Sequence, residues 1–511
     1  MSAPVTYGGW QSERSGFMGR LSGPGFALVA GGSVLLLVPV NLGSWSAALL
    51  CGPTALLFFT LAFGRVQGLS ADEWFLLAVR HQIAVASQRN VFMSGVFTPR
   101  SRRTGRQPMD LPGTLARLRF LEAPDGLGAT VGISYDPSAG TYTAVARVTF
   151  PGLALVDTEQ QTARVAAWAA FLRSHCTEDS PIVRIAVHQR CLPDNGAALR
   201  AWTDRHVAAD APAAAVRALA ELMADAGPAA AVRETYLSVT LSAARARLAI
   251  KGAGGGQVAA AAVLVREAHA LQTGLASAGL NVVAWLGPRA LAETVRTAYD
   301  PEAQVMLARR AAQAQDQPGD SSAPGLQAGV DPDLAGPAFA ETDWGTYRHD
   351  GAWTVSYQVR TWPQADVYAT FLQPLLRPRP NARRSLSMIY EPVRPRRARQ
   401  DLARERVKRD SARSLRARTG RSESEDERRE ASVARAQDVA RAAGQGVVRM
   451  TAVLAVTVTS ASELETACAE LQADASAAGL EVRRMWGTQD VGFSTAALPL
   501  GQGLPDRRVG F

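Results

Sequence analysis

The stretch ASAGLNVVAWLG, residues 276–287, has a near copy in ASAAGLEVRRMWG, residues 475–487. When the two are aligned, Gly279 falls on Gly479. In both copies an alanine-rich helical pattern ends at this glycine, which is the usual residue after a helix C-terminus, and a short strand pattern follows. The copies predict that the chain contains one structural unit twice.

The patterns around the two copies follow the same order. Each has a strand hairpin, a helix, a strand, a connecting segment, a strand, a helix and a final strand. The segments are 129–135, 141–150, 158–174, 182–189, 235–243, 257–278 and 281–285 in the first unit, and 345–349, 352–360, 365–376, 385–391, 447–458, 460–478 and 481–485 in the second. This order predicts an α+β fold with two tandem ferredoxin-like α/β sandwich domains. We place them at 111–312 and 341–511, joined by a Pro/Gly-rich linker at 313–340.

The N-terminal part carries a long uncharged segment. After a tail at 1–20, no charged residue occurs between Leu21 and Gly64, and the sequence VPVNLGSWS at 38–46 interrupts this run. A membrane span needs about 20 apolar residues, so the run predicts a transmembrane hairpin at 21–64. A buried helical hairpin fits less well because it normally carries a charged face. A cleaved signal peptide also fits less well, since its apolar core is only about 7–15 residues long.

Basic residues flank this run on both sides. Arg14 and Arg20 precede it, and Arg65 is the first of several arginines that follow it. Positive charge near a span favours the cytoplasmic side. The distribution predicts an inner-membrane protein with two spans, whose termini and soluble body are cytoplasmic.

Residues 65–110 are expected to form a juxtamembrane helix and a basic linker. In LSADEWFLLAVRHQIAVAS, Ser70 and Glu73 have capping-box spacing, and an apolar face includes Phe75, Val79 and Ile83. Such a helix can lie in the lipid headgroup region or pack on the next domain, and the sequence leaves both open.

Motifs for common catalytic chemistry are missing from the sequence. The only lysines, Lys251 and Lys408, are not followed by Ser or Thr, so neither is the lysine of a P-loop. GISYD at 132–136 does not fit a nucleophile elbow, and no HExxH occurs. The glycine-rich KGAGGGQ at 251–257 is better explained as a plain loop than as a phosphate cradle. His175, Cys176, His188 and Cys191 lack the spacing of a zinc site. We therefore predict no catalytic residue, metal or cofactor.

The segment 394–442 is a charged insertion in the second unit. Its apolar residues are too sparse for a core-facing helix, and the formal net charge of the chain, +9, is carried almost entirely by arginine. A solvated, salt-bridged arm is one explanation, and a docking surface for an acidic partner or a membrane is the other. Nucleic acid is a weaker option because no aromatic residue is present for base stacking. The candidate docking residues are Arg394, Arg396, Arg397, Arg399, Arg404, Arg406, Lys408 and Arg409.

Four stretches resemble an actinobacterial family of conjugation and secretion membrane proteins. They are GLALVDTEQQTARVAAWAAFL (152–172), WPQADVYATFLQPLL (362–376), MIYEPVRPRRA (388–398) and GTQDVGFSTAALPLGQGL (487–504). The N-terminus resembles the PrgI-type subunit of type IV secretion systems, and the rest resembles the non-motor part of the conjugation ATPase. The resemblance implies a non-catalytic inner-membrane component that serves a motor ATPase as a cytoplasmic platform, as an oligomer within the apparatus.

Other functions stay open at this point. The EccE-like component of type VII secretion also has two N-terminal spans and a soluble body. A membrane-anchored enzyme of unknown activity and a lipid- or DNA-binding module are the further alternatives.

Overall fold

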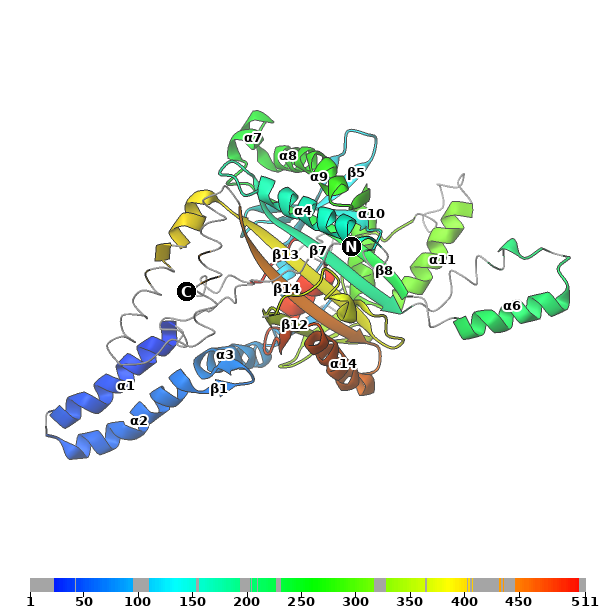
Figure 1. The fold of residues 1–511 in the computed structure, drawn as a ribbon. Coiled ribbons are helices and arrows are strands. Elements are labelled where there is room, and N and C mark those ends of the chain that lie inside the picture. Colours follow the sequence, from blue (N-terminus) through cyan, green and yellow to red (C-terminus); the bar gives the residue numbers. More distant parts are fainter. Residues whose placement is uncertain are drawn as a thin grey trace. The chain divides into compact units, whose positions relative to one another are not determined.

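The computed structural model describes residues 23–41, 43–94, 110–152, 156–193, 203, 205–208, 210–226, 231–316, 328–363, 365–401, 403–404, 407, 432, 435 and 446–504. These residues form two compact units (Figure 1). The sheet unit contains the described residues of 91–395 and 446–504. The helical unit contains those of 23–90 and 396–435.

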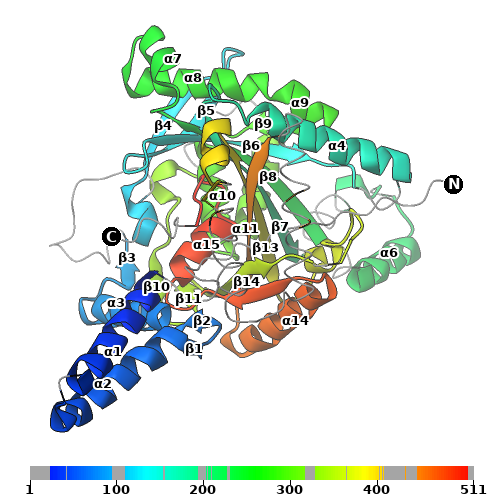
Figure 2. The same cartoon turned by 60° about the vertical axis from the view of Figure 1, so that its left-hand side comes forward.

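A large antiparallel sheet of 13 strands runs through the described part of the sheet unit (Figures 1 and 2). Its main path has the order β3-β10-β11-β12-β14-β13-β7-β8-β6-β5-β4, with β15 added beside β12 and β9 beside β6. The strands are β3 (Val91–Met93), β4 (Arg119–Pro124), β5 (Thr130–Asp136), β6 (Thr141–Thr149), β7 (Ile182–Pro193), β8 (Ala231–Ser242), β9 (Asn281–Trp285), β10 (Phe339–Thr342), β11 (Tyr347–His349), β12 (Ala352–Thr361), β13 (Arg383–Val393), β14 (Val447–Val458) and β15 (Glu481–Arg484).

The internal repeat is visible in the strand order. The first repeat pairs its strands in the order β9-β6-β8-β7, and the second in the order β15-β12-β14-β13. Numbered along the chain, both orders read 4-1-3-2, which is the order of a split βαβ unit. The repeats meet where β7 pairs with β13, with His188 opposite Ser387. One sheet therefore runs through both repeats.

Helices cover both faces of this sheet. On one face α8 (Gly256–Ala270) and α9 (Gln272–Ser277) pack on the first repeat, α4 (Thr158–Ser174) packs beside α9 and against β13 and β14, and α14 (Leu464–Ala477) packs on the second repeat. The first three lie together in both views. Phe171, Leu237 and Leu264 belong to the apolar core beneath them. On the other face α10 (Pro288–Tyr299) and α15 (Gln489–Ala497) follow the last strand of each repeat, at Gly287 and Thr488.

The remaining helices of the sheet unit are shorter or lie away from the sheet. They are η3 (Gly113–Arg117), α6 (Ala213–Ala226), α7 (Arg247–Gly252), α11 (Ala303–Asp316), η4 (Pro332–Leu334), η5 (Gln373–Leu376) and η6 (Ala461–Glu463).

The predicted helix at 365–376 is wrong. The structure has turns there and only a short 3-10 helix, η5. Pro374 lies inside this segment and has no backbone N–H to donate, and Tyr368 keeps 56% of its surface exposed. The segment buries too little apolar surface to stabilise the helix that its periodicity predicts.

The helical unit contains α1 (Gly23–Asn41), α2 (Trp45–Phe63), the strand pair β1 (Arg65–Val66) and β2 (Leu69–Ser70), and α3 (Ala71–Ala86). Helices α1 and α2 pack against each other, and Gly31 and Gly32 lie against the side chain of Phe58. The absence of a side chain on these glycines permits the close approach.

The two predicted membrane spans are not found. Among the described residues, no helix combines the length and apolarity needed to cross a membrane. The turn at Gly43 divides the uncharged run into two helices of 19 residues, each with a proline inside, Pro39 and Pro53. At 1.5 Å per residue each helix is about 28 Å long, against about 30 Å of hydrocarbon. The prediction of a transmembrane hairpin is therefore wrong, and the inner-membrane location and orientation drawn from Arg14, Arg20 and Arg65 fall with it.

Candidate functional site

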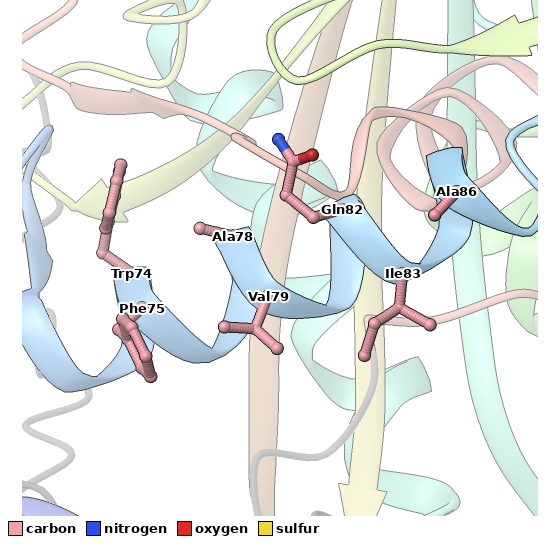
Figure 3. Close-up of a pocket in the computed structure, with 7 residues that line it drawn as sticks. All are labelled: Trp74, Phe75, Ala78, Val79, Gln82, Ile83 and Ala86. Carbon is pink, nitrogen blue, oxygen red and sulfur yellow. The ribbon is translucent and has the colours of Figure 1, made fainter.

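An open apolar hollow lies along helix α3 on the surface of the helical unit. Seven residues line it, and they all lie on this helix (Figure 3). They are Trp74, Phe75, Ala78, Val79, Gln82, Ile83 and Ala86. Phe75 and Ile83 keep 50% and 60% of their surface exposed. A water-exposed face of this composition is typical of a surface that binds an apolar partner.

The start of α3 differs from the expected capping box. Ser70 occupies the N-cap position, but its side chain makes no capping hydrogen bond. The indole N–H of Trp74 instead donates to Oε1 of Gln67, at 3.1 Å. This bond ties the first turn of α3 to the β1–β2 turn, and it fixes one end of the apolar face.

Exposed apolar side chains concentrate in this unit. More than half of the large apolar side chains exposed in the described part of the chain lie between residues 26 and 85. They include Leu49 and Leu50 of α2, which are 79% and 82% exposed. The α1–α2 hairpin and α3 thus share an apolar surface chemistry.

The predicted docking arginines are only partly described. Arg396, Arg397 and Arg399 lie on the helix that follows β13, and their side chains are exposed, as is that of Arg404. Arg397 and Arg404 each lie 3.9 Å from a carboxylate oxygen of Asp401. Arg394 precedes this helix and is half-buried, while Arg406, Lys408, Arg409, Arg14 and Arg20 lie outside the described residues. Arg65 is exposed in β1.

A largely buried electrostatic cluster lies where the two repeats join. Arg190 of β7 contacts Oε2 of Glu234 at 2.7 Å and also donates to the carbonyl oxygen of Thr294. Burial alone would raise the pKa of Glu234, but the charge and hydrogen bonds of Arg190 outweigh it and lower this pKa. Arg383 of β13 donates to the carbonyl oxygen of Thr297 at 3.0 Å. Arginines from both repeats thus hold the C-terminal turn of α10.

His349 completes this cluster. Its Nδ1 contacts the carbonyl oxygen of Tyr299, and its Nε2 lies 2.8 Å from Oγ1 of Thr354. Burial lowers the pKa of His349 to about 4, so the ring is neutral at pH 7. The side chain is fully buried, so the ring has no access to a substrate. We interpret the cluster as a structural joint.

A small polar cavity of about 80 Å³ lies where the C-terminal segment meets β5–β7. Ser134, Asp136, Thr143 and Arg184 line it together with Gly501. Arg184 donates to Oε1 of Glu391 and to the carbonyl oxygen of Gly501, at 2.8 and 2.6 Å. The hydroxyl of Ser134 donates to the carbonyl oxygen of Leu500 at 3.1 Å. These polar groups bind one another. Their hydrogen bonds hold the C-terminal segment in place and leave no charge in the cavity free for a ligand.

Both carboxylate oxygens of Asp136 also have bonding partners. Its Oδ1 accepts from the amide and hydroxyl of Ser138, and its Oδ2 lies 3.2 Å from Arg117. Burial opposes ionisation, but these hydrogen bonds and the Arg117 charge lower the pKa of Asp136. The carboxylate is a structural anion.

The described residues contain no group of His, Cys, Asp and Glu that could hold a metal ion. Cys176 and Cys191 are buried free thiols, and burial raises the pKa of both. His188 lies in β7, where it contacts Ser238 at 3.1 Å, and burial lowers its pKa to about 3. KGAGGGQ spans the end of α7, the connecting loop and the start of α8.

The polar face of β7 could have been predicted from one sequence signal. Arg184, His188 and Arg190 occur at even spacing in the strand pattern, which places them on one face of the sheet. The sequence analysis did not predict a water-exposed apolar surface on α2, because it assigned these apolar residues to a membrane span.

No protein-family model matches the chain, and no curated protein matches it. A role in secretion or conjugation therefore gains no support from these comparisons. The family resemblance stays a prediction.

Proposed function

We propose that the protein is a non-catalytic binding platform, and that its partner is the motor ATPase of a transfer apparatus of the kind its sequence resembles. The observation that carries the proposal is the apolar surface of the helical unit, above all the exposed face of α3. The choice of a motor ATPase as the partner rests on the resemblance alone.

The distribution of chemical groups supports a binding role. In the described part of the sheet unit, charged side chains bond to one another, as at the largely buried pair Arg190–Glu234 and the partly exposed pair Arg184–Glu391. Side chains bonded in this way offer neither a nucleophile nor a free base. Exposed side chains of the described part of the chain include apolar groups of the helical unit and Arg397 and Arg404, which lie near Asp401.

We assign different roles to these two surfaces. Burial of apolar side chains such as Phe75 and Val79 contributes affinity, at about 25 cal/mol for each Å² removed from water. Exposed charges such as Arg397 mainly accelerate encounter with an acidic partner, and their effect weakens with salt.

Co-purification of the full chain with the motor ATPase of the same cell tests the proposal. Phe75→Glu and Val79→Glu place charges on the α3 face and should abolish recovery of the ATPase. Leu248→Glu is the matched control, because Leu248 is 83% exposed on α7 of the sheet unit. If both α3 variants recovered the ATPase at the wild-type level, the proposed role of α3 would be contradicted.

A second measurement separates a platform from an enzyme. The purified chain should not hydrolyse ATP by itself, whereas the complex should. Turnover of ATP by the chain alone would overturn the non-catalytic assignment. Retention of the chain on neutral phosphatidylcholine vesicles, lost in the same α3 variants, would instead assign the apolar face to lipid.

A further inference from the structure

The last strands of the two repeats occupy equivalent positions but have different chemistry. β9 pairs with residues 146–149 of β6, and β15 pairs with residues 357–361 of β12. Among the described residues, neither strand pairs with a second neighbour. Each therefore presents a free edge of backbone N–H and C=O groups, and such edges are templates for pairing with another chain.

The edge of β15 is protected by charged side chains. Glu481 accepts from the hydroxyl of Thr361 at 2.7 Å, and Arg484 lies 3.1 Å from Glu465. Arg484 also stacks over the ring of Trp486. Charged residues on an edge strand oppose the addition of a further strand.

The edge of β9 carries no charged side chain, and a single bulge is its main irregularity. Its sequence, Asn281-Val-Val-Ala-Trp285, contains no charge. A bulge at Val283 interrupts the ladder with β6, and this side chain is 59% exposed. Phe150, just beyond the end of β6, is also 39% exposed. The bulge shortens the straight part of the edge, which limits any added pairing to a few residues.

We propose that two copies of the chain associate through antiparallel pairing of β9 with β9. The strand suits itself as a partner, since antiparallel pairing of two uncharged strands brings no like charges together. The chain already uses this mode of assembly internally, because β7 and β13 join its two repeats as antiparallel neighbours. The inference does not rest on the proposed function.

Sedimentation velocity of the full chain between about 1 and about 100 µM tests this association, a range suited to a small interface. Wild type should shift from monomer towards dimer as its concentration rises. Val283→Lys adds a charge to the edge and should remain monomeric throughout. Val258→Lys is the control, since Val258 is 82% exposed on α8 of the same repeat, and it should dimerise like wild type.

Amide hydrogen exchange of the wild type gives a readout that does not depend on a variant. The amides of residues 281–285 should exchange more slowly at the higher concentration, while those of β15 should not change. A wild type that stays monomeric, equal association of Val283→Lys, or protection confined to the helical unit would each overturn the proposal.

Discussion

Gly501 shows how one residue fixes the C-terminal segment. Its φ is +74°, in the left-handed region that favours glycine, and it carries the carbonyl that accepts from Arg184. A β-carbon at this position would collide with the side chain of Thr143. Conformation and space therefore both require glycine here.

We predict that Gly501→Ala lowers the free energy of unfolding by about 2–4 kcal/mol, because backbone strain and a core collision add together. Urea denaturation measures the loss. Gly140→Ala separates the two causes, since Gly140 has a similar φ of +61° and no atom within 4 Å of the added carbon. It should lose only about 1 kcal/mol. Equal losses in both variants would show that the collision with Thr143 contributes nothing.

Helix α10 shows how one element is held by both repeats. Arg190 and Arg383 donate to carbonyl oxygens in its last turns, and His349 contacts the carbonyl oxygen of Tyr299. The last four carbonyls of a helix lack partners within the helix and carry partial negative charge, so Arg383 is well suited to its position at Thr297, while Arg190 binds Thr294 one turn earlier. The end of α10 thereby couples the two repeats.

Arg383→Met tests this coupling. The variant keeps much of the apolar stem but loses the hydrogen bonds to Thr297, Pro301 and Gln304. We expect a loss of about 2–3 kcal/mol in stability, with faster amide exchange in the last turn of α10. Arg310→Met on α11, where the side chain is exposed, should change neither. Unaltered exchange at α10 in Arg383→Met would show that this arginine does not hold the helix end.

Elements with a strong period and buried strands were predictable from sequence. The strand order follows from two copies of one pattern, and the helix hairpin at 23–63 follows from the VNLGSWS break. The helix expected at 365–376 failed because turns and a proline outweigh a periodic pattern that buries little. The pairing of β7 with β13 was not predictable, since periodicity along one strand says nothing about its neighbour in space.

The candidate site was predictable in part for a related reason. The apolar face of α3 is visible as a helical period in the sequence, and the structure shows it exposed. The joint at Arg190 and Glu234 depends on which strands become neighbours, so sequence distance hides it. The membrane assignment failed at the two helices themselves. The break was correctly expected to be a turn, but each helix has only 19 residues with a proline inside, and neither is long and apolar enough to span a membrane.

At the scale of the whole molecule, two buried histidines make stability depend on pH. Burial lowers the pKa of His188 to about 3 and that of His349 to about 4. In the unfolded chain both rings gain a proton near pH 6.5, while in the folded chain they do not. The unfolded state then binds more protons, so stability is full above pH 6.5 and is lost as the pH falls towards these values.

Urea midpoints measured between pH 7.5 and pH 4 should follow this dependence. We expect the free energy of unfolding to fall by about 1.4 kcal/mol per pH unit for each histidine below pH 6.5. His188→Gln should reduce the slope by the share of one ring, whereas His206→Gln, at an exposed position, should leave it unchanged. A flat profile from pH 6.5 to pH 5 would contradict the role of these rings.

The pairing of β7 with β13 has a consequence for the covalent chain. Each repeat completes the other's sheet, so continuity of the backbone between residues 316 and 328 is not what holds the halves together. Two polypeptides divided in that interval, one ending near Asp316 and the other beginning near Ala328, should find each other and rebuild the sheet by fragment complementation. In this respect the intact chain resembles a heterodimer whose two subunits are joined in one polypeptide.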